Sequence, residues 1–376
     1  MGIYQELGLK TIINASDTYT RIGGSRMSDG VLAAMCEAGQ SFVDLVELAQ
    51  KACQAIARMT QNESAFISSG AGACLVLTAA ALITRGDPYL ERELPDASRC
   101  AKNEIIIFAA QTAESMPGYW QLLGKSGASL VKIKSSLKSL RDAITGKTAG
   151  IYYFLGDRYE TGLPPLPDII RAAHEREVPL IIDAAAQLPP KSNLWHYTRD
   201  LGADGIIFSG GKYLMGPQST GLFLGKEEIA RRCYALSNPN IIIGRPYKVG
   251  KEEYAAIYTA VKEFVAADED QVRSCQNKHL DVIEQGIGQC PGIVISRVQH
   301  GRVGQDAPML VIDLTNGKTA RDCADFLSRQ CDPAIDIGYE KDVQPGQENR
   351  VLINSINLRE NELYPIIRSL KRFCEL

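Results

Sequence analysis

The stretch Phe208-Ser209-Gly210-Gly211-Lys212 decides how the rest of the chain is interpreted. Phe208 is the last residue of the apolar run Gly205-Ile206-Ile207-Phe208. This run is too short for a helix and is flanked by turn residues, so it predicts a buried strand. Lys212 then comes just past the carboxyl end of that strand, and an open α/β sheet binds ligands at this edge. A lysine there can pair with an anion or form a Schiff base.

A second short apolar run, Pro179-Leu180-Ile181-Ile182-Asp183, ends in an acid. Lys212 follows Asp183 by 29 residues, which fits one crossover connection between neighbouring strands. We therefore expect both side chains at the same sheet edge. A lysine and an aspartate together suit pyridoxal 5′-phosphate (PLP), because the lysine holds the cofactor aldehyde as an imine and the acid keeps the pyridine nitrogen protonated.

A third candidate stretch, Ser68-Ser69-Gly70-Ala71-Gly72-Ala73, lies between an expected strand at residues 65–67 and an apolar helix that runs to about residue 84. A small-residue turn at a helix N-terminus can cradle a phosphate, because its free N–H groups and the helix dipole favour an anion. Two alternatives remain. One is a helix start that only needs close packing, and the other is a dinucleotide-binding motif, although Leu75 stands where that motif has its third glycine.

The chain alternates short apolar runs with helical patterns, which predicts a mostly parallel sheet. Further strands are expected at residues 104–108, 129–133, 149–154 and 220–224, and helices at residues 44–59, 116–123, 136–144, 166–176 and 226–235. Residues 1 to about 30 are expected to be mostly irregular. After a break at residues 237–240, we expect a long helical stretch from about residue 251 into the 280s, strands at 293–298, 309–314 and 351–354, and helices at 320–329 and 360–373.

This pattern predicts three parts. Residues 1–43 form an N-terminal arm that packs on the small domain and the active site, residues 44–240 form a large cofactor-binding domain, and residues 241–376 form a small C-terminal α+β domain.

Composition and charge exclude several classes of protein. With 45% hydrophobic and 23% charged residues, the chain is typical of soluble globular proteins. The net charge of −3 does not indicate a nucleic-acid partner, and the longest apolar run, residues 71–83, is too short to span a membrane. The start of the chain lacks the pattern of a signal peptide, so we expect a cytoplasmic protein whose ten cysteines are reduced. Four scattered histidines and no C-x-x-C pair argue against a metal site.

The order of these stretches resembles the aspartate aminotransferase superfamily of PLP enzymes, fold type I. Four motifs are similar to the group around bacterial selenocysteine synthase (L-seryl-tRNA selenium transferase) and D-glucosaminate-6-phosphate ammonia-lyase: Ile12-Ile13-Asn14-Ala15-Ser16, Gly23-Gly24-Ser25-Arg26-Met27-Ser28, Asp183-Ala184-Ala185-Ala186-Gln187-Leu188-Pro189-Pro190 and Ser209-Gly210-Gly211-Lys212. The likeness covers about residues 10–240. It implies an α/β fold with a mostly parallel, seven-stranded type of sheet and a smaller α+β C-terminal domain.

The resemblance also implies roles for individual residues. Lys212 would be the catalytic Schiff-base lysine and Asp183 the catalytic partner of the pyridinium nitrogen. The residues that would hold the cofactor phosphate are Gly70, Ala71, Gly72 and Ser209. Ala185 would pack on one face of the cofactor ring, and Gln111 stands where many relatives have a histidine over the other face.

Two arginines are candidates for binding the substrate. Arg26 lies in a glycine-containing loop with Arg21, and such a loop is either a solvated turn or an arm that binds an anion. Arg350, just before a late strand, is a candidate for the substrate carboxylate and is otherwise a surface arginine.

The resemblance implies a PLP-dependent lyase that carries out α,β-elimination on a β-hydroxy amino acid, such as D-glucosaminate 6-phosphate, and yields a keto acid and ammonia. The same substrate carbanion, reprotonated or trapped, would give an amino acid racemase or a selenocysteine synthase-like transferase. A ligand-binding protein that retains the fold is a third hypothesis. The expected partners are a small, possibly phosphorylated amino acid and further copies of the chain, as a homodimer or a higher multiple, because the superfamily builds its site between subunits.

Overall fold

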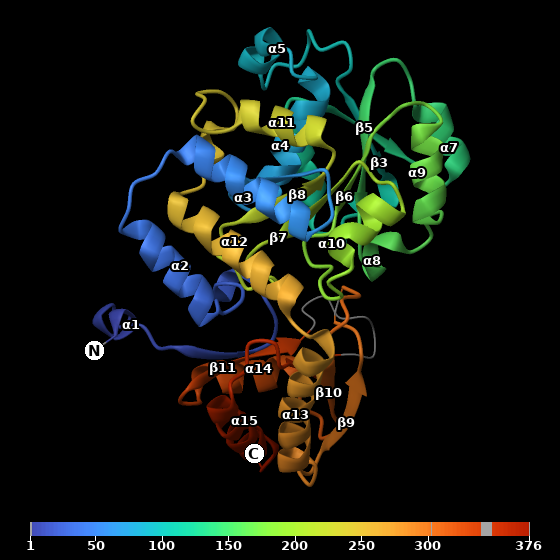
Figure 1. Cartoon of the computed structure of the whole chain (residues 1–376). Coiled ribbons are helices and arrows are strands. Elements are labelled where there is room, and N and C mark those ends of the chain that lie inside the picture. Colours follow the sequence, from blue (N-terminus) through green and yellow to red (C-terminus); the bar gives the residue numbers. More distant parts are fainter. Residues whose placement is uncertain (1, 302, 340–347, 376) are drawn as a thin grey trace. The chain divides into compact units, whose positions relative to one another are not determined.

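The computed structural model describes residues 2–301, 303–339 and 348–375, and the chain divides into two compact units, each with its own β-sheet (Figure 1). Unit 1 comprises Met1–Arg26 and Ala267–Leu376, and unit 2 comprises Met27–Ala266.

The sheet of unit 2 has seven strands in the order β2-β8-β7-β6-β5-β3-β4. Its strands are β2 (Ser64–Ser68), β3 (Glu104–Phe108), β4 (Ser129–Ile133), β5 (Thr148–Phe154), β6 (Leu180–Asp183), β7 (Gly205–Ser209) and β8 (Gly221–Gly225). β8 runs antiparallel to both of its neighbours, and the other neighbouring pairs are parallel. The predicted mostly parallel, seven-stranded sheet is therefore confirmed.

The helices of unit 2 cover this sheet. They are α2 (Asp29–Gly39), α3 (Leu45–Met59), α4 (Ala71–Thr84), α5 (Pro88–Glu93), α6 (Gln121–Gly124), α7 (Leu137–Ala143), α8 (Asp157–Glu160), α9 (Leu166–His174), α10 (Asn193–Trp195), α11 (Glu227–Leu236) and α12 (Lys251–Ala266). α4 is buried on all sides from Ala73 onward, as its apolar composition requires. It packs against β5, β7 and β8, whereas α7 and α9 pack against each other, on the right in Figure 1.

The boundaries of unit 2 follow from the packing of α12. This helix contacts α2 and α3 and buries Tyr254, Ile257 and Val261, and the Lys251 ammonium donates to the Ala38 carbonyl at 2.7 Å. The boundaries expected after residues 43 and 240 both fall inside unit 2. The long helix expected from residue 251 into the 280s is in fact two helices, because the Asp268 side chain caps a new helix, α13 (Glu269–Ile287).

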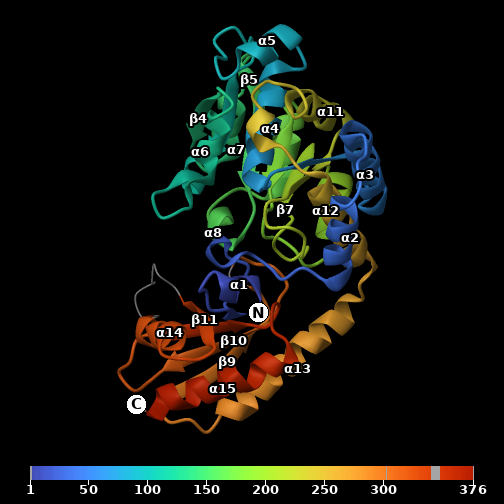
Figure 2. The same ribbon diagram turned by 90° about the vertical axis from the view of Figure 1, so that its left-hand side faces the viewer.

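Unit 1 is built on a five-stranded sheet in the order β1-β11-β12-β10-β9. Its elements are α1 (Ile3–Glu6), β1 (Ile12–Ala15), α13, β9 (Ile293–Val298), β10 (Met309–Leu314), α14 (Ala320–Arg329), β11 (Ala334–Tyr339), β12 (Arg350–Asn354) and α15 (Glu360–Glu375). β1 and β11 were not expected; they form the parallel pair of an otherwise antiparallel sheet. α13 and α15 pack side by side, as Figure 2 shows.

Candidate active site

The structure brings Asp183 and Lys212 to the same edge of the sheet of unit 2. β6 and β7 are parallel neighbours, and Asp183, the last residue of β6, is paired with Ile207 of β7. Lys212 lies in the turn directly after β7, where its carbonyl accepts a hydrogen bond from the Met215 N–H at 2.9 Å. The predicted juxtaposition of an acid and a lysine is therefore present, because both strands end at the same edge.

The carboxyl group of Asp183 is buried, and its environment acts on its pKa in opposing directions. Burial raises the pKa, whereas the Ala185 N–H, which donates to Oδ1 at 3.0 Å, and the nearby positive charge of Lys212 lower it. Burial is the largest of the three effects, so the pKa of Asp183 lies above its ordinary value. A further cation or N–H donor beside this carboxylate would stabilise its charged form.

The start of α4 has the features of a phosphate site. The first N–H groups of a helix lack partners within the helix, and α4 has no side-chain cap at its N-cap residue, Gly70. Gly70 has φ 89, and a Cβ built on it would meet nothing within 4 Å, so open space adjoins the turn. Behind the turn, a Cβ on Gly221 would lie 2.2 Å from the carbonyl carbon of Gly70, so the turn rests directly on β8.

An unsatisfied hydroxyl also lies next to this turn. The Oγ atom of Ser68, at the end of β2, is buried and has no hydrogen-bond partner among the described residues. A buried hydroxyl is stabilised when a partner forms a hydrogen bond with it. Open space, an uncapped helix start and this hydroxyl fit the phosphate of PLP, so the predicted cradle of Gly70, Ala71 and Gly72 is structurally suitable.

Ser209 and Ala185 lie beside the acid and the lysine. The Ser209 N–H donates to the Ala185 carbonyl at 3.3 Å, and both residues are half-buried at the ends of neighbouring strands. The structure thus groups Asp183, Ala185, Ser209 and Lys212, as the sequence predicted. The roles of these residues toward a cofactor remain predictions.

Gln111 has a different position from the one expected. Its side chain is fully buried: Nε2 donates to the carbonyls of Phe154 at 2.7 Å and Tyr159 at 3.3 Å, and Oε1 accepts from the Phe154 N–H at 3.2 Å. The 3-10 turn Ala109–Thr112 that follows β3 directs this side chain toward β5 and away from open space. Gln111 therefore fastens backbone segments together, and its contacts give no support to the prediction that it covers a cofactor ring.

Two tyrosines near Asp183 were missed by the sequence analysis. Partial burial raises the pKa of both Tyr119 and Tyr159, and the negative charge of Asp183 raises it further, so both phenols lie within reach of that charge. Leu122, in the same segment as Tyr119, lies 3.0 Å from a Cβ built on Gly72, so this segment also reaches the start of α4. Both tyrosines lie in short helical turns in the connections after β3 and β5, which are too short for a periodicity that predicts which way a side chain points.

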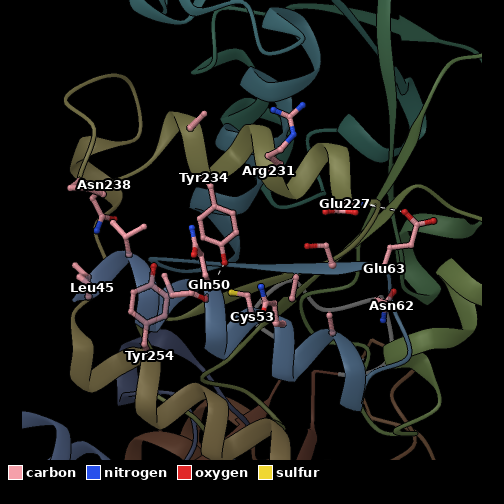
Figure 3. Close-up of a pocket in the computed structure, with 18 of the residues that line it drawn as sticks. Leu45, Gln50, Cys53, Asn62, Glu63, Glu227, Arg231, Tyr234, Asn238 and Tyr254 are labelled. Atoms are coloured by element: carbon pink, nitrogen blue, oxygen red, sulfur yellow. Dashed lines mark hydrogen bonds between the residues drawn. The ribbon is translucent and has the colours of Figure 1, made fainter. Parts of the chain in front are cut away.

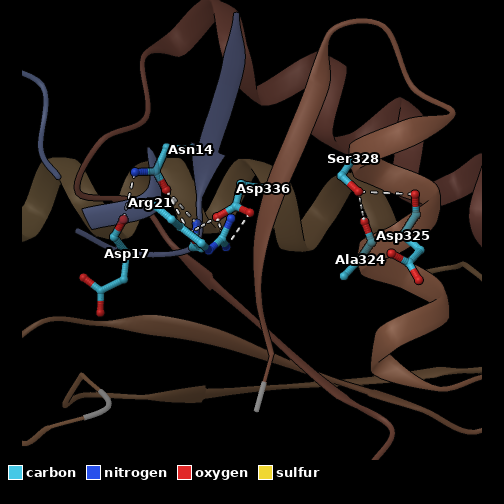
Figure 4. A network of polar contacts seen from close by, with 8 residues as sticks. Asn14, Asp17, Arg21, Ala324, Asp325, Ser328 and Asp336 are labelled. Carbon is cyan, nitrogen blue, oxygen red and sulfur yellow. Dashed lines mark hydrogen bonds and ion pairs between the residues drawn. The ribbon is translucent and has the colours of Figure 1, made fainter. Parts of the chain in front are cut away.

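The arginines chosen as substrate ligands are paired with acids of unit 1. Arg26 binds Glu362 at 2.8 Å and the Asn357 carbonyl at 3.0 Å, and Arg350 binds both carboxylate oxygens of Asp313 at 2.7 and 3.0 Å. The neighbouring Arg21 is held in the same way by Asp336, in a network that also contains Asn14 and Asp17 (Figure 4).

Such ion pairs with acids of the same unit are expected of arginines that stabilise the fold. The role of Arg26 and Arg350 in substrate binding therefore remains a prediction.

A groove of about 780 Å³ lies elsewhere in unit 2, between α3 and α11 (Figure 3). It reaches Ser64 at the amino end of β2, whereas the cradle follows Ser68 at the other end of that strand, and none of the predicted site residues lines it. Burial raises the pKa of the Cys53 thiol in this groove to about 12, so this cysteine stays protonated and is a poor nucleophile at neutral pH.

Two further classes of site were searched in the described part of the chain. No group of three or more His, Cys, Asp or Glu side chains there is arranged to hold a metal ion. No described helix combines the length and apolar character needed to cross a membrane.

Comparisons with known proteins agree with this geometry. The family model for aminotransferase class-V matches residues 31–239. The chain is 28% identical over 334 residues to D-glucosaminate-6-phosphate ammonia lyase of Salmonella typhimurium, covering 85% of this chain and 88% of the relative. It is 30% identical over 298 residues to 5′-C-glycyluridine monooxygenase-decarboxylase of a Streptomyces species, covering 77% of this chain and 72% of the relative.

Solved structures show the same fold. A D-glucosaminate-6-phosphate ammonia-lyase superposes with a TM-score of 0.82 at 24% identity, covering 100% of this chain and 98% of that one. A serine palmitoyltransferase from Sphingomonas wittichii superposes with a TM-score of 0.60 at 13% identity, covering 97% and 88%. The resemblance inferred from the motifs is confirmed.

Proposed function

The chain belongs to the aminotransferase class-V family, and from this premise we propose that it is an ammonia-lyase acting on a β-hydroxy amino acid. PLP is the cofactor. The observation that carries the proposal is the buried carboxylate of Asp183 beside the charge of Lys212, on the sheet edge that also carries the uncapped start of α4.

The residues present suit the parts of the cofactor. The start of α4, with Gly70, Ala71 and Gly72, would bind the phosphate, and Asp183 would hold a proton on the ring nitrogen by its negative charge. When bound, PLP supplies a ring that accepts the electron pair left at the substrate α-carbon. Burial of Asp183 strengthens this role, because a buried carboxylate favours a charged partner more than an exposed one does.

Lys212 is the group that moves the proton. Its amine takes the proton from the α-carbon and returns it to the hydroxyl group that leaves the β-carbon, so that one water is lost. The resulting enamine tautomerises, and water hydrolyses it to a keto acid and ammonia. The water gained equals the water lost, so the net products are a deoxygenated keto acid and ammonia.

We propose a phosphorylated amino sugar acid such as D-glucosaminate 6-phosphate as the substrate. The support is the similarity to the Salmonella ammonia lyase, which extends over most of both chains. Racemisation, transfer to the β-carbon and the oxidative chemistry named for the Streptomyces relative are the competing outcomes, because a carbanion at the α-carbon precedes each of them. The homodimer and the cytoplasmic location expected from the sequence remain proposals.

The test is an assay of ammonia and keto acid released from D-glucosaminate 6-phosphate and from D-glucosaminate, with an oxygen electrode in the same vessel. Equal amounts of ammonia and keto acid without oxygen uptake would support the lyase. Exchange of the α-hydrogen with deuterium but no ammonia would point to a racemase. Oxygen uptake with release of carbon dioxide would replace the lyase by the chemistry of the Streptomyces relative.

A further inference from the structure

The hydroxyl of Tyr159 is buried and has no hydrogen-bond partner within the described ranges. Tyr159 lies on α8, directly after β5, and its ring packs against that of Phe154 with the centroids 5.9 Å apart. A phenol buried without a partner is stabilised when a ligand accepts a hydrogen bond from it. This hydroxyl is therefore a candidate ligand contact that the mechanism above does not use.

The position of Tyr159 is fixed by four hydrogen bonds that fasten α8 to β3 and β5 and the turns that follow them. Gln111 holds the carbonyls of Phe154 and Tyr159, and the Glu160 carboxylate accepts from the Gly156 N–H at 2.9 Å and from the Tyr153 hydroxyl at 3.0 Å. Because the Gln111 side chain is fully buried, it reaches the site only through the backbone that it holds.

Sheet order places Tyr159 on a defined side of the acid and the lysine. In the order β2-β8-β7-β6-β5, the phosphate cradle after β2 lies on one side of the β6–β7 pair, and α8 after β5 lies on the other. In PLP the ring nitrogen lies opposite the aldehyde carbon, and the phosphate arm and the ring hydroxyl flank that carbon on opposite sides. With Asp183 at the nitrogen and the phosphate at α4, the ring hydroxyl oxygen would be on the side of β5.

We propose that the Tyr159 hydroxyl donates a hydrogen bond to the ring hydroxyl oxygen of PLP, and that Gln111 is a positioning residue that aims Tyr159 at this oxygen. The proposal rests on the PLP dependence of the proposed function but not on its substrate. The charge of Asp183 acts on the Tyr159 phenol, which agrees with a position beside the ring.

The experiment uses the visible absorbance of bound PLP, which needs no substrate and no turnover. A hydrogen bond to the ring oxygen stabilises the negative charge there, so this oxygen attracts the proton on the lysine-linked nitrogen less strongly. The hydrogen bond therefore lowers the pH at which that proton is lost. Its loss in Tyr159→Phe should raise the pH midpoint of the absorbance change by about one unit and weaken PLP binding roughly tenfold. Tyr152→Phe is the matched control, because its hydroxyl donates to Thr78 at 2.7 Å inside the core; it should leave the midpoint unchanged.

A double-mutant cycle tests the positioning role of Gln111. Gln111→Glu loses both donors of Nε2 and should shift the midpoint in the wild-type background but not in Tyr159→Phe. Equal shifts in the two backgrounds would mean that Gln111 acts on the midpoint independently of Tyr159, which would overturn its positioning role, and an unchanged midpoint and PLP affinity in Tyr159→Phe would overturn the contact. Wild-type protein that binds PLP but releases no ammonia would contradict only the proposed reaction, whereas failure to bind PLP would overturn both.

Discussion

Lys212 is one of several lysines in unit 2, and its position after β7 distinguishes it chemically. We predict that borohydride reduction of the PLP-loaded protein fixes the cofactor to the peptide that contains Lys212, because a lysine at this edge can hold the aldehyde as an imine. Lys212→Ala should lose this labelling and at least about 100-fold in ammonia release.

Lys226 is the matched control for Lys212. It pairs with Glu63 at 2.6 Å, beyond the far end of β8, so Lys226→Ala should keep both the labelling and the activity. Label found on a peptide without Lys212 would contradict the assignment.

Asp183 gives a prediction for stability against pH. Its pKa in the folded, cofactor-free protein is raised above the unfolded value of 3.8, chiefly by burial. Between these two pKa values the folded state binds more protons than the unfolded state, so the free energy of unfolding falls as the pH rises through this window and then levels off.

Asp183→Asn removes this titration. As the pH rises from about 4, the free energy of unfolding of the cofactor-free wild type should therefore fall relative to that of cofactor-free Asp183→Asn. Denaturant titrations of both proteins at several pH values would measure this difference. PLP-loaded wild type should recover the loss, because a positive ring nitrogen compensates the carboxylate. A constant difference between the two proteins at every pH would mean that Asp183 keeps an ordinary pKa.

At the level of elements, the cradle depends on the close approach of β8 to the turn before α4. A Cβ at Gly221 would lie 2.2 Å from the Gly70 carbonyl carbon and 2.4 Å from the Ala71 nitrogen, so the turn must move to accept it. We predict that Gly221→Ala weakens PLP binding at least tenfold, measured by absorbance titration. Gly146→Ala is a suitable control because no atom lies within 4 Å of its Cβ position. Unchanged affinity in Gly221→Ala would mean that the cradle does not bind the phosphate.

The helix caps give a second prediction at this scale. Asp268 accepts hydrogen bonds from the N–H groups of Asp270 at 3.0 Å and Gln271 at 3.2 Å, which starts α13. Asp268→Ala should lower the free energy of unfolding of the protein by about 1 kcal/mol, as urea titration would report, whereas Asp268→Asn should retain most of the cap. An equal loss in both variants would assign the effect to charge and not to the cap.

The elements that the sequence predicted are those with a repeating signal. The apolar runs of β6 and β7 end in turn residues, and the Asp44 cap with its apolar stripe predicts α3, so these were placed within a few residues. β1 was missed because its four residues are too few for a period, and it forms only by pairing with β11, which lies more than 300 residues away. Pairing between such distant segments has no local signature.

The candidate site was predictable to the same extent. Asp183 ends β6 and Lys212 follows β7, so the order of the strands places both at one edge of the sheet, whatever the conformation of the loops. Gln111 and Tyr159 follow β3 and β5 in short helical turns, and the direction of their side chains depends on hydrogen bonds between these turns. Sequence alone could indicate that the segment after β3 differs from its relatives, but it could not indicate that Gln111 turns inward.

At the scale of the whole molecule, exposed apolar side chains point to a second copy of the chain. Phe42 is 100% exposed just before α3, and Val43 and Val46, at 55% and 45%, follow it, Val46 in the first turn of that helix. Ile241, 85% exposed, follows Asn240, which lines the same groove as Val46. Soluble proteins rarely leave such a group open, so we predict a homodimer that covers it, in line with the expectation from the superfamily.

Sedimentation velocity at micromolar concentration should show one species of twice the chain mass. Phe42→Asp should shift this species toward the monomer and reduce PLP affinity if the partner completes the site, because a carboxylate buried in an apolar contact opposes association. Tyr89→Asp, at a tyrosine that is 78% exposed on α5, should leave the dimer intact. A wild-type protein that sediments as a monomer and still releases ammonia would show that one chain is a sufficient catalyst and that the apolar group serves another purpose.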